Sequence, residues 1–188
     1  MRKTKNRLSA IEKTAYHEAG HVVTNYLVGF EIEYVTIVPD EDSEGHVKSN
    51  EFNNYYYEGF RVYHIKDYEL IFNSIVANLA GYLCVRKVTG RGKLFVDIGD
   101  YGRSLDLFKS FNISHNLRDS MLETAEYFIR DIFNEERSWE LVKLIARSLL
   151  ERKTLTGQEV LGIIENSNYY ILRKTLKRPS GVLPSEAV

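Results

Sequence analysis

The sequence predicts a mainly helical domain with one small β-hairpin. Most of the chain carries apolar residues at helical spacing, in segments bounded by capping residues. The one stretch with strand-like alternation, residues 33–38, follows the first of these segments and ends at a proline. The chain has 188 residues, of which 44% are hydrophobic and 27% charged, which suits one globular domain with its own core.

Composition limits the class of protein. We expect residues 1–7 to be a flexible basic arm, residues 8–178 a single domain, and residues 179–188 a tail. The net charge of -1 argues against a nucleic-acid partner. No run approaches about 18 consecutive apolar residues, so we expect no membrane span. The single cysteine, Cys84, excludes an internal disulfide, suits a buried position, and favours a cytoplasmic location.

The first helix has a readable start and end. Ser9 and Glu12 form the Ser-x-x-Glu pattern of a capping box, in which each side chain satisfies a free backbone N–H group of the other residue. Gly29 is suited to the left-handed conformation that stops a helix. The spacing therefore predicts a helix over residues 10–28.

A hairpin is predicted next. Residues 33–38 are a strand, residues 40–45 are a charged turn, and residues 46–49 are the returning strand. Residues 50–66 have no clear period, and we interpret them as an irregular loop that shields the functional site.

The remainder is predicted to be helical. Asp67 is expected to cap a central, strongly apolar helix that ends near residue 88 before Gly90. A Gly-punctuated loop leads to a third helix that starts near Gly99 and Asp100 and continues to residue 111. Later helices are expected over residues 114–134, with Ser114 as cap, over 138–152, and over 156–166, with Thr156 and Glu159 as a second capping box, and a last turn over 169–176.

The first helix contains His17-Glu18-Ala19-Gly20-His21. Histidines four residues apart lie on the same helix face, so both imidazoles can bind one metal ion. Glu18 then lies beside the metal and can act as a general base on a water molecule that the metal activates. This is the His-Glu-x-x-His pattern of zinc peptidases. The alternative is two ordinary polar residues on a solvated face, and the capped, amphipathic helix argues against it.

A catalytic zinc site needs a third protein ligand and one open position. Spacing alone does not choose among the remaining candidates. These are His46, His64, His115, Asp97, Asp100 and Asp106.

Further motifs occur in a fixed order along the chain. Residues 14–21 are followed by Val-Thr-Ile-Val-Pro and a glycine (35–39 and 45), by Leu-Ala-Gly (79–81), and by Leu-Leu-Glu with Thr-Leu-Thr-Gly-Gln-Glu-Val (149–160). In these motifs the chain resembles the protease domain of the FtsH-type ATP-dependent zinc metalloproteases. The resemblance spans roughly residues 8–165.

The resemblance implies the ligand set. In that family the third zinc ligand is an aspartate that opens a later helix, and the matching residue here is Asp100, with the small Ser104 one turn on. Asp97 is the alternative, because the Gly-rich loop leaves the match uncertain by a few residues. His17, His21 and Asp100 are thus the expected Zn²⁺ ligands, and Glu18 the expected catalytic base.

The chain also departs from the family pattern. Tyr-Leu-Cys-Val at residues 82–85 stands where the family has Arg-Ala-Ala-Glu, so a polar support of the site is missing or replaced. The phosphate-binding pattern Gly-x-x-x-x-Gly-Lys-Ser/Thr does not occur, and we expect neither an ATPase module nor a membrane anchor. The substrate is then an unfolded or flexible polypeptide, or a separate ATPase or adaptor delivers it. The resemblance implies hexamers, but a monomer or dimer is equally open.

These observations predict a zinc metalloendopeptidase. We expect Val35, Thr36, Ile37 and Val38 to present a strand edge to which an extended substrate adds as another strand. Two alternatives stay open. One is a small zinc peptidase that cuts a single regulatory partner, and the other is a zinc-stabilised interaction module without activity.

Overall fold

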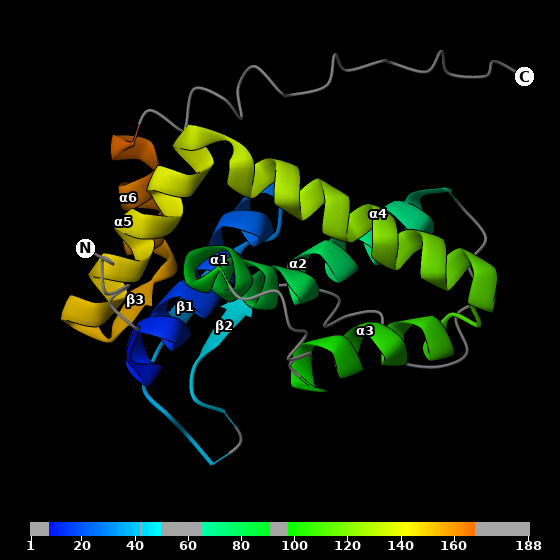
Figure 1. Cartoon of the computed structure of the whole chain (residues 1–188), viewed down its shortest axis with the longest axis horizontal. Coiled ribbons are helices and arrows are strands. Elements are labelled where there is room, and N and C mark those ends of the chain that lie inside the picture. The colour runs from blue at the N-terminus through cyan, green and yellow to red at the C-terminus, as the bar shows by residue number, and fades with distance from the viewer. Residues whose placement is uncertain (1–7, 42, 50–64, 91–97, 168–188) are drawn as a thin grey trace, which may run out of the picture.

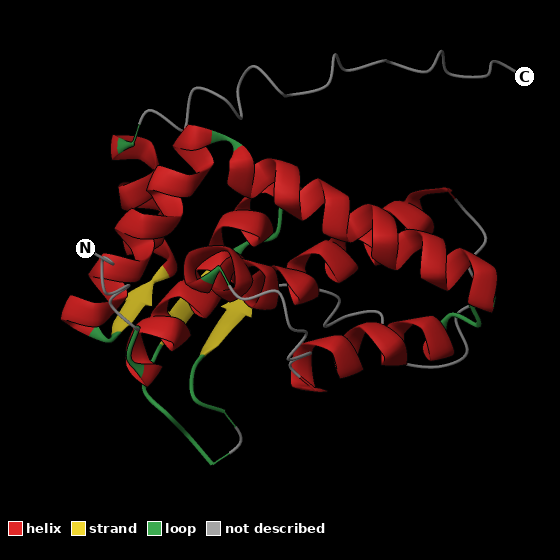
Figure 2. Ribbon diagram, in the orientation of Figure 1, coloured by secondary structure: helices red, strands yellow, loops and turns green. Residues whose placement is uncertain are grey.

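A computed structural model describes residues 8–41, 43–49, 65–90 and 98–167. The predicted fold class is confirmed at the level of architecture, because the chain is mainly helical and has one small antiparallel sheet (Figures 1 and 2). The elements of the described chain are α1 (Ala10–Val28), β1 (Ile32–Thr36), β2 (His46–Ser49), α2 (Ile65–Thr89), α3 (Ile98–Ser110), α4 (His115–Asn134), α5 (Glu136–Arg152), β3 (Thr154–Thr156) and α6 (Gly157–Asn166).

The ends of α1 are as predicted. The Ser9 hydroxyl accepts the Glu12 backbone N–H at 3.4 Å, and the Glu12 carboxylate accepts the Ser9 N–H at 2.7 Å. Gly29 adopts the left-handed conformation with φ of 92°, and its N–H bonds back to the last turn. These caps fix the two ends of α1, and within the helix residues 18–26 are all buried.

Helices α1 and α2 lie against each other at close range. A side chain on Gly20 would bring its Cβ within 2.7 Å of the Cys84 Cβ and 2.9 Å of the Ala80 carbonyl oxygen. Only glycine therefore lets the two backbones approach this closely at Gly20. Cys84 is fully buried at this contact, as predicted, and burial raises the pKa of its thiol.

Helix α2 is the centre of the helical part. It packs against α1, α3 and α4, and α1 also packs against α5 (Figure 1). By length and composition alone, Tyr68–Thr89 is apolar enough to cross a membrane, but 61% of this window is buried within the protein. Central helices of globular domains meet the same criterion, so the absence of a membrane span stays a prediction.

The sheet has three strands in the order β2-β1-β3. The hairpin of β1 and β2 is confirmed, with Val35 opposite Val47. Strand β3 is not among the predicted elements, and it pairs with β1 so that Val35 also faces Leu155. The expectation that β1 offers a free edge is therefore wrong, because it is hydrogen-bonded on both sides. Ile37 continues this pairing, since its N–H donates to the Lys153 carbonyl oxygen.

The observed bounds of α4, α5 and α6 lie close to those that the sequence predicts. Ser114 caps α4, and Thr156 and Glu159 form the second capping box at the start of α6. The predicted cap at Asp67 is wrong, since α2 begins at Ile65 and residue 67 lies in its first turn. An acidic residue is favoured both at the cap and in the first turn, so the sequence signal does not separate the two. Predictions for residues 1–7, 50–64, 91–97 and 168–188 fall outside the described residues.

Candidate metal centre

Two helices bring three potential metal ligands together. His17 and His21 come from the central turn of α1, and Asp100 comes from the first turn of α3. The Asp100 Oδ2 atom lies 3.0 Å from His17 Nε2 and 3.1 Å from His21 Nε2, and the two Nε2 atoms are 3.0 Å apart. This group of side chains could hold a metal ion.

The triangle of donor atoms has the size of a metal site. In a tetrahedral zinc site with bonds of about 2.0–2.1 Å, neighbouring ligand atoms are about 3.3 Å apart. The observed separations of 3.0 to 3.1 Å are only slightly shorter. Two imidazole nitrogens and a carboxylate oxygen that converge in this way need a cation or a proton between them, because their lone pairs otherwise repel.

A backbone contact fixes the orientation of the His21 ring. Its Nδ1 atom lies 2.7 Å from the carbonyl oxygen of Ala77 on α2. A carbonyl oxygen only accepts, so Nδ1 carries the proton and donates it. The lone pair of His21 Nε2 is then directed at the centre of the triangle, which is the outer-shell arrangement common to metal-binding histidines.

Gly81 of α2 leaves the space that the two imidazole rings need. A Cβ atom at this position would lie 2.4 Å from His21 Nε2 and 2.5 Å from His17 Nε2. Both distances are well inside van der Waals contact, so a side chain here would push into the donor atoms. The absence of a side chain at Gly81 thus lets the two imidazoles pack against α2 with their Nε2 atoms converging, and together with Asp100 the residues present fit a bound metal.

Charge is concentrated at this centre. Burial alone would lower the pKa of His21, but the charge and hydrogen bond of Asp100 outweigh it and raise that pKa to about 9. Burial alone would raise the pKa of Asp100, but the charges and hydrogen bonds of His21 and His17 hold it far below its usual range. In the metal-free protein a proton on His21 therefore takes the place of the cation.

Metal affinity is expected to rise with pH. Because the pKa of His21 is about 9, metal must displace one proton at neutral pH, and the apparent affinity should fall up to about tenfold per pH unit below that value. The same pairing stabilises the metal-free fold fully below pH 6.5, and this contribution is lost as the pH rises through about 9. Chelator competition across this range measures the slope. An affinity independent of pH would contradict a protonated His21.

Glu18 lies next to the centre and is almost entirely buried, with 3% of its surface exposed. Gly45, just before β2, packs over it, and a Cβ on Gly45 would lie 3.1 Å from Glu18 Oε1. Burial raises the pKa of the Glu18 carboxyl, although the charges of His21 and His17 oppose the shift. A raised pKa moves the carboxyl toward the range in which it exchanges protons efficiently.

A buried polar link holds α3 against α2. The Asn78 side-chain amide donates to the Ser104 hydroxyl at 3.3 Å, and that hydroxyl donates to the Asp100 backbone carbonyl at 3.4 Å. Both side chains are buried. From the sequence, Ser104 is expected only as a small residue, and Asn78 is not among the expected site residues. The polar side chain of Asn78 on an apolar helix face is the signal that could have identified it.

Replacing Asn78 with alanine should loosen the position of Asp100. We expect metal affinity to fall about tenfold, as is typical when an outer-shell partner is lost, and the free energy of unfolding to fall by about 1 kcal/mol for one buried hydrogen bond. Chelator competition and denaturant unfolding measure the two effects. A loss of stability with unchanged metal affinity would show that Asn78 supports the fold but not the centre.

The other candidate ligands lie elsewhere or outside the described residues. His46 contacts the Tyr34 hydroxyl at 2.9 Å and Asp40 at 3.4 Å. His115 and Asp106 are exposed on α4 and α3, and residues 64 and 97 are outside the described residues. Of the expected substrate contacts, Val35, Thr36 and Ile37 are buried, and only Val38 is exposed, at 50%.

Comparisons with protein-family models and with curated proteins found no match for this chain.

Proposed function

We propose that the protein is a zinc metalloendopeptidase that hydrolyses unfolded or flexible polypeptides. The observation that carries the proposal is the convergence of His17, His21 and Asp100 beside the buried Glu18. Three protein ligands leave a fourth position for water or substrate, as in catalytic zinc sites. A buried carboxylate beside this centre can act as a base in hydrolysis, whereas a metal site that only stabilises a fold needs no such base.

Each residue has a distinct part. His17 and His21 would hold zinc through Nε2, and Asp100 through Oδ2. Zinc in this place would supply a Lewis acid that acidifies water and stabilises negative charge on the scissile carbonyl oxygen. Glu18 takes a proton from the attacking water on its carboxylate and delivers it to the leaving amine nitrogen. The His21 ring keeps its orientation throughout, because Nδ1 stays bonded to Ala77.

The donor set alone does not identify the metal. Two histidines and one carboxylate also bind iron(II) in non-haem oxygenases. Glu18 favours the hydrolytic use, because an iron centre that activates oxygen needs no buried base at this point. The raised pKa of Glu18, caused mainly by burial, also suits proton transfer.

An extended substrate would add to β2, since β1 has no free edge. Strands β2 and β3 are the two edges of the described sheet, each bonded on one side only. Of the two, β2 begins at His46, directly after Gly45, which packs over Glu18. A peptide paired with this edge would pass close to the base, and recognition would depend on backbone groups more than on sequence. We expect such a chain to arrive unfolded or from a separate ATPase or adaptor.

Metal removal and replacement test the proposal. The purified protein should contain about one zinc per chain and should cut a casein-like unfolded protein. A chelator should abolish the cleavage, and added zinc should restore it. A cobalt-substituted sample should give the absorption spectrum of a four-coordinate site, and this spectrum should change when a peptide-like inhibitor binds the open position.

Other results would point to other functions. Cleavage of one partner but of no unfolded protein would indicate a dedicated regulatory peptidase. A metal site with four protein ligands and no cleavage would indicate an interaction module. Iron in place of zinc, with no hydrolysis after zinc loading, would overturn the proposal.

A further inference from the structure

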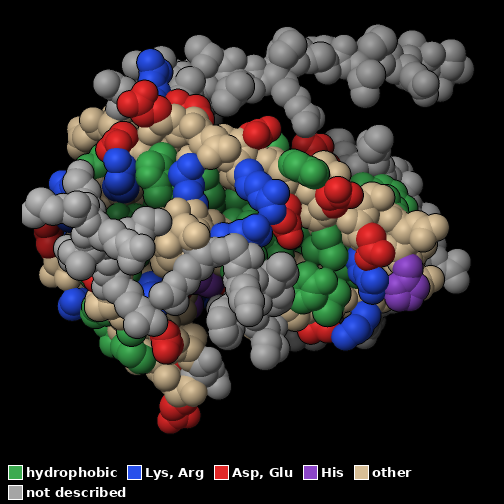
Figure 3. All heavy atoms as spheres, viewed as in Figure 1, with side chains coloured by type: hydrophobic (Ala, Val, Ile, Leu, Met, Phe, Trp, Pro, Cys, Tyr) green, Lys and Arg blue, Asp and Glu red, His purple; other side chains and the backbone are tan. Residues whose placement is uncertain are grey.

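A second candidate site lies between α2 and α4 and shares no residue with the metal centre. It is a cavity of about 310 Å³ that opens to the surface. In the space-filling view, Lys and Arg side chains gather beside apolar ones on the face below α4 (Figure 3). The cavity is lined by Leu83, Arg86, Lys87 and Gly90 of α2 and its C-terminal end and by Arg130, Phe133 and Asn134 of α4.

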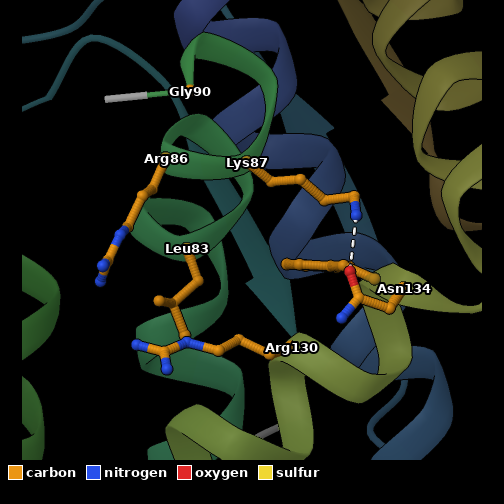
Figure 4. A pocket seen from close by; sticks show the side chains of 7 residues that line it. Leu83, Arg86, Lys87, Gly90, Arg130 and Asn134 are labelled. Atoms are coloured by element: carbon orange, nitrogen blue, oxygen red, sulfur yellow. Dashed lines mark hydrogen bonds between the residues drawn. The ribbon is translucent and has the colours of Figure 1, made fainter. Parts of the chain in front are cut away.

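The lining has a strong excess of positive charge. Arg86, Lys87 and Arg130 contribute three cations, and no carboxylate lines the cavity. Figure 4 shows the guanidinium groups of Arg86 and Arg130 on one side of Leu83, while Lys87 extends the other way toward Asn134. Like charges held around one hollow repel each other, so an anion bound among them would be stabilised.

The three cations differ in how well they are already paired. Lys87 Nζ donates to the Asn134 side chain at 2.8 Å and lies 5.1 Å from the centre of the Trp139 ring. Arg130 forms an ion pair with Glu126 one turn away, at 2.7 Å, and both groups are more than a third exposed. Such exposed pairs are weak. The backbone carbonyl of Arg86 accepts the Gly90 N–H, but the Arg86 side chain has no hydrogen-bond or ion-pair partner within the described part of the chain.

The helix dipole explains only part of this cluster. Arg86 and Lys87 lie in the last turn of α2, where cations offset the partial negative charge of a helix C-terminus. Arg130 lies within α4 and not in its last turn, so the dipole of α4 does not explain a cation at this position. Its guanidinium group nevertheless faces the same hollow, near the end of α2.

We propose that this cavity binds an organic carboxylate that carries an apolar group. The guanidinium groups of Arg86 and Arg130 match the two oxygens of a carboxylate. Leu83 and Phe133 are buried and provide an apolar wall for the attached side chain. The volume is at the lower end of the range of about 300–1,000 Å³ found for small-molecule sites. The C-terminal residue of a polypeptide and a free apolar acid have this same chemistry.

N-acetyl-L-leucine is a suitable probe, and its neutral amide is the matched control. Trp139 is the only tryptophan and contacts Lys87, so its fluorescence reports on the cavity. We expect a saturable fluorescence change with the acid and none with the amide. The side-chain Nε–H resonances of Arg86 and Arg130 should shift in the same titration, which gives a readout independent of Trp139.

Variants assign the binding to the cavity. Arg86→Gln and Arg130→Gln should each weaken binding about tenfold or more, since each removes a charged hydrogen-bond partner. Arg147→Gln removes an exposed charge on α5 away from the cavity and should change affinity less than about twofold. Glu126→Gln should tighten binding about two- to threefold, because it frees Arg130 from a competing carboxylate.

Arg86→Lys separates a loss of binding from a loss of folding, because lysine keeps the charge but lacks the forked geometry of arginine. We expect this variant to bind less tightly than the natural protein and to keep an unchanged circular dichroism spectrum. Equal binding of acid and amide, or an Arg147→Gln effect as large as that of Arg86→Gln, would overturn the proposal. Inorganic phosphate binding as tightly as the acid would overturn the apolar part of the assignment. The titration should give the same result with metal-free protein, so its outcome is independent of the peptidase proposal.

A peptide such as acetyl-Ala-Ala-Leu distinguishes the two sources of the carboxylate. Tighter binding of the peptide than of N-acetyl-L-leucine would support a polypeptide C-terminus as the ligand. Equal affinity would support a free acid, with the same contacts to Arg86 and Arg130. Absence of any saturable response in both fluorescence and arginine resonances would overturn the site altogether.

Discussion

Replacing Glu18 with glutamine is expected to abolish peptide hydrolysis while metal binding is kept. Glutamine has nearly the same shape but cannot take a proton from water, and general acid–base catalysis typically contributes about 10²–10⁴-fold to the rate. Glu18 is not one of the three converging donors, so the metal content should stay at the level of the natural protein. Cleavage of an unfolded protein and metal analysis of the same sample measure both effects.

A surface variant controls for the loss of one negative charge. Glu165 is exposed on α6, and Glu165→Gln should cleave at the natural rate. If Glu18→Gln cut an unfolded protein as fast as the natural chain, the assignment of Glu18 as base would be wrong. If Glu18→Gln lost its metal as well, the loss of activity would no longer test the base, and the metal content decides between these readings.

Replacing Gly81 with alanine is expected to remove the metal. The added Cβ would lie 2.4 and 2.5 Å from the two Nε2 atoms, well inside van der Waals contact. Side chains would have to shift to accept it, and overpacking of this kind costs about 1–3 kcal/mol. We expect metal affinity to fall more than about 100-fold, since the donor atoms are pushed apart, and hydrolysis to fall with it. Chelator competition measures the affinity.

Two other helical glycines provide the matched control. A Cβ on Gly102 or Gly162 would meet nothing within 4 Å. Glycine in a helix interior is less favourable than alanine by about 0.5–1 kcal/mol, so Gly162→Ala should raise the free energy of unfolding and leave metal binding unchanged. A Gly81→Ala protein that bound metal normally would contradict the role of Gly81 in positioning the imidazoles of His17 and His21.

The sequence correctly predicted those features that depend on residues close to one another along the chain. The capping boxes at Ser9 and Thr156 and the cap at Ser114 were predicted and are present. The pairing of His17 with His21 on one face of α1 follows from helical periodicity alone. These features depend on residues within about one helical turn, and their physics is the same in any fold.

Other features needed the folded chain. Asp100 meets His21 across 79 residues of sequence, and spacing alone left six candidates for that place. Strand β3 has only three residues, and its pairing with β1 depends on how α5 returns the chain to the sheet. The same pairing leaves β1 without the free edge that is expected for it from the sequence. Asn78 and Gly81 became interpretable only once α2 was seen against α1 and α3.

By itself, the sequence determined a mainly helical chain, the ends of most helices, and a turn of α1 that presents two imidazoles and a carboxylate. The tertiary structure decided which later carboxylate joins them, which strands have an open side, and that a missing side chain on α2 leaves room for the two imidazoles. Local patterns report the hydrogen bonds and side-chain spacing of a single element. A metal centre depends on distances between elements, and these are set by the packing of α2 against its neighbours.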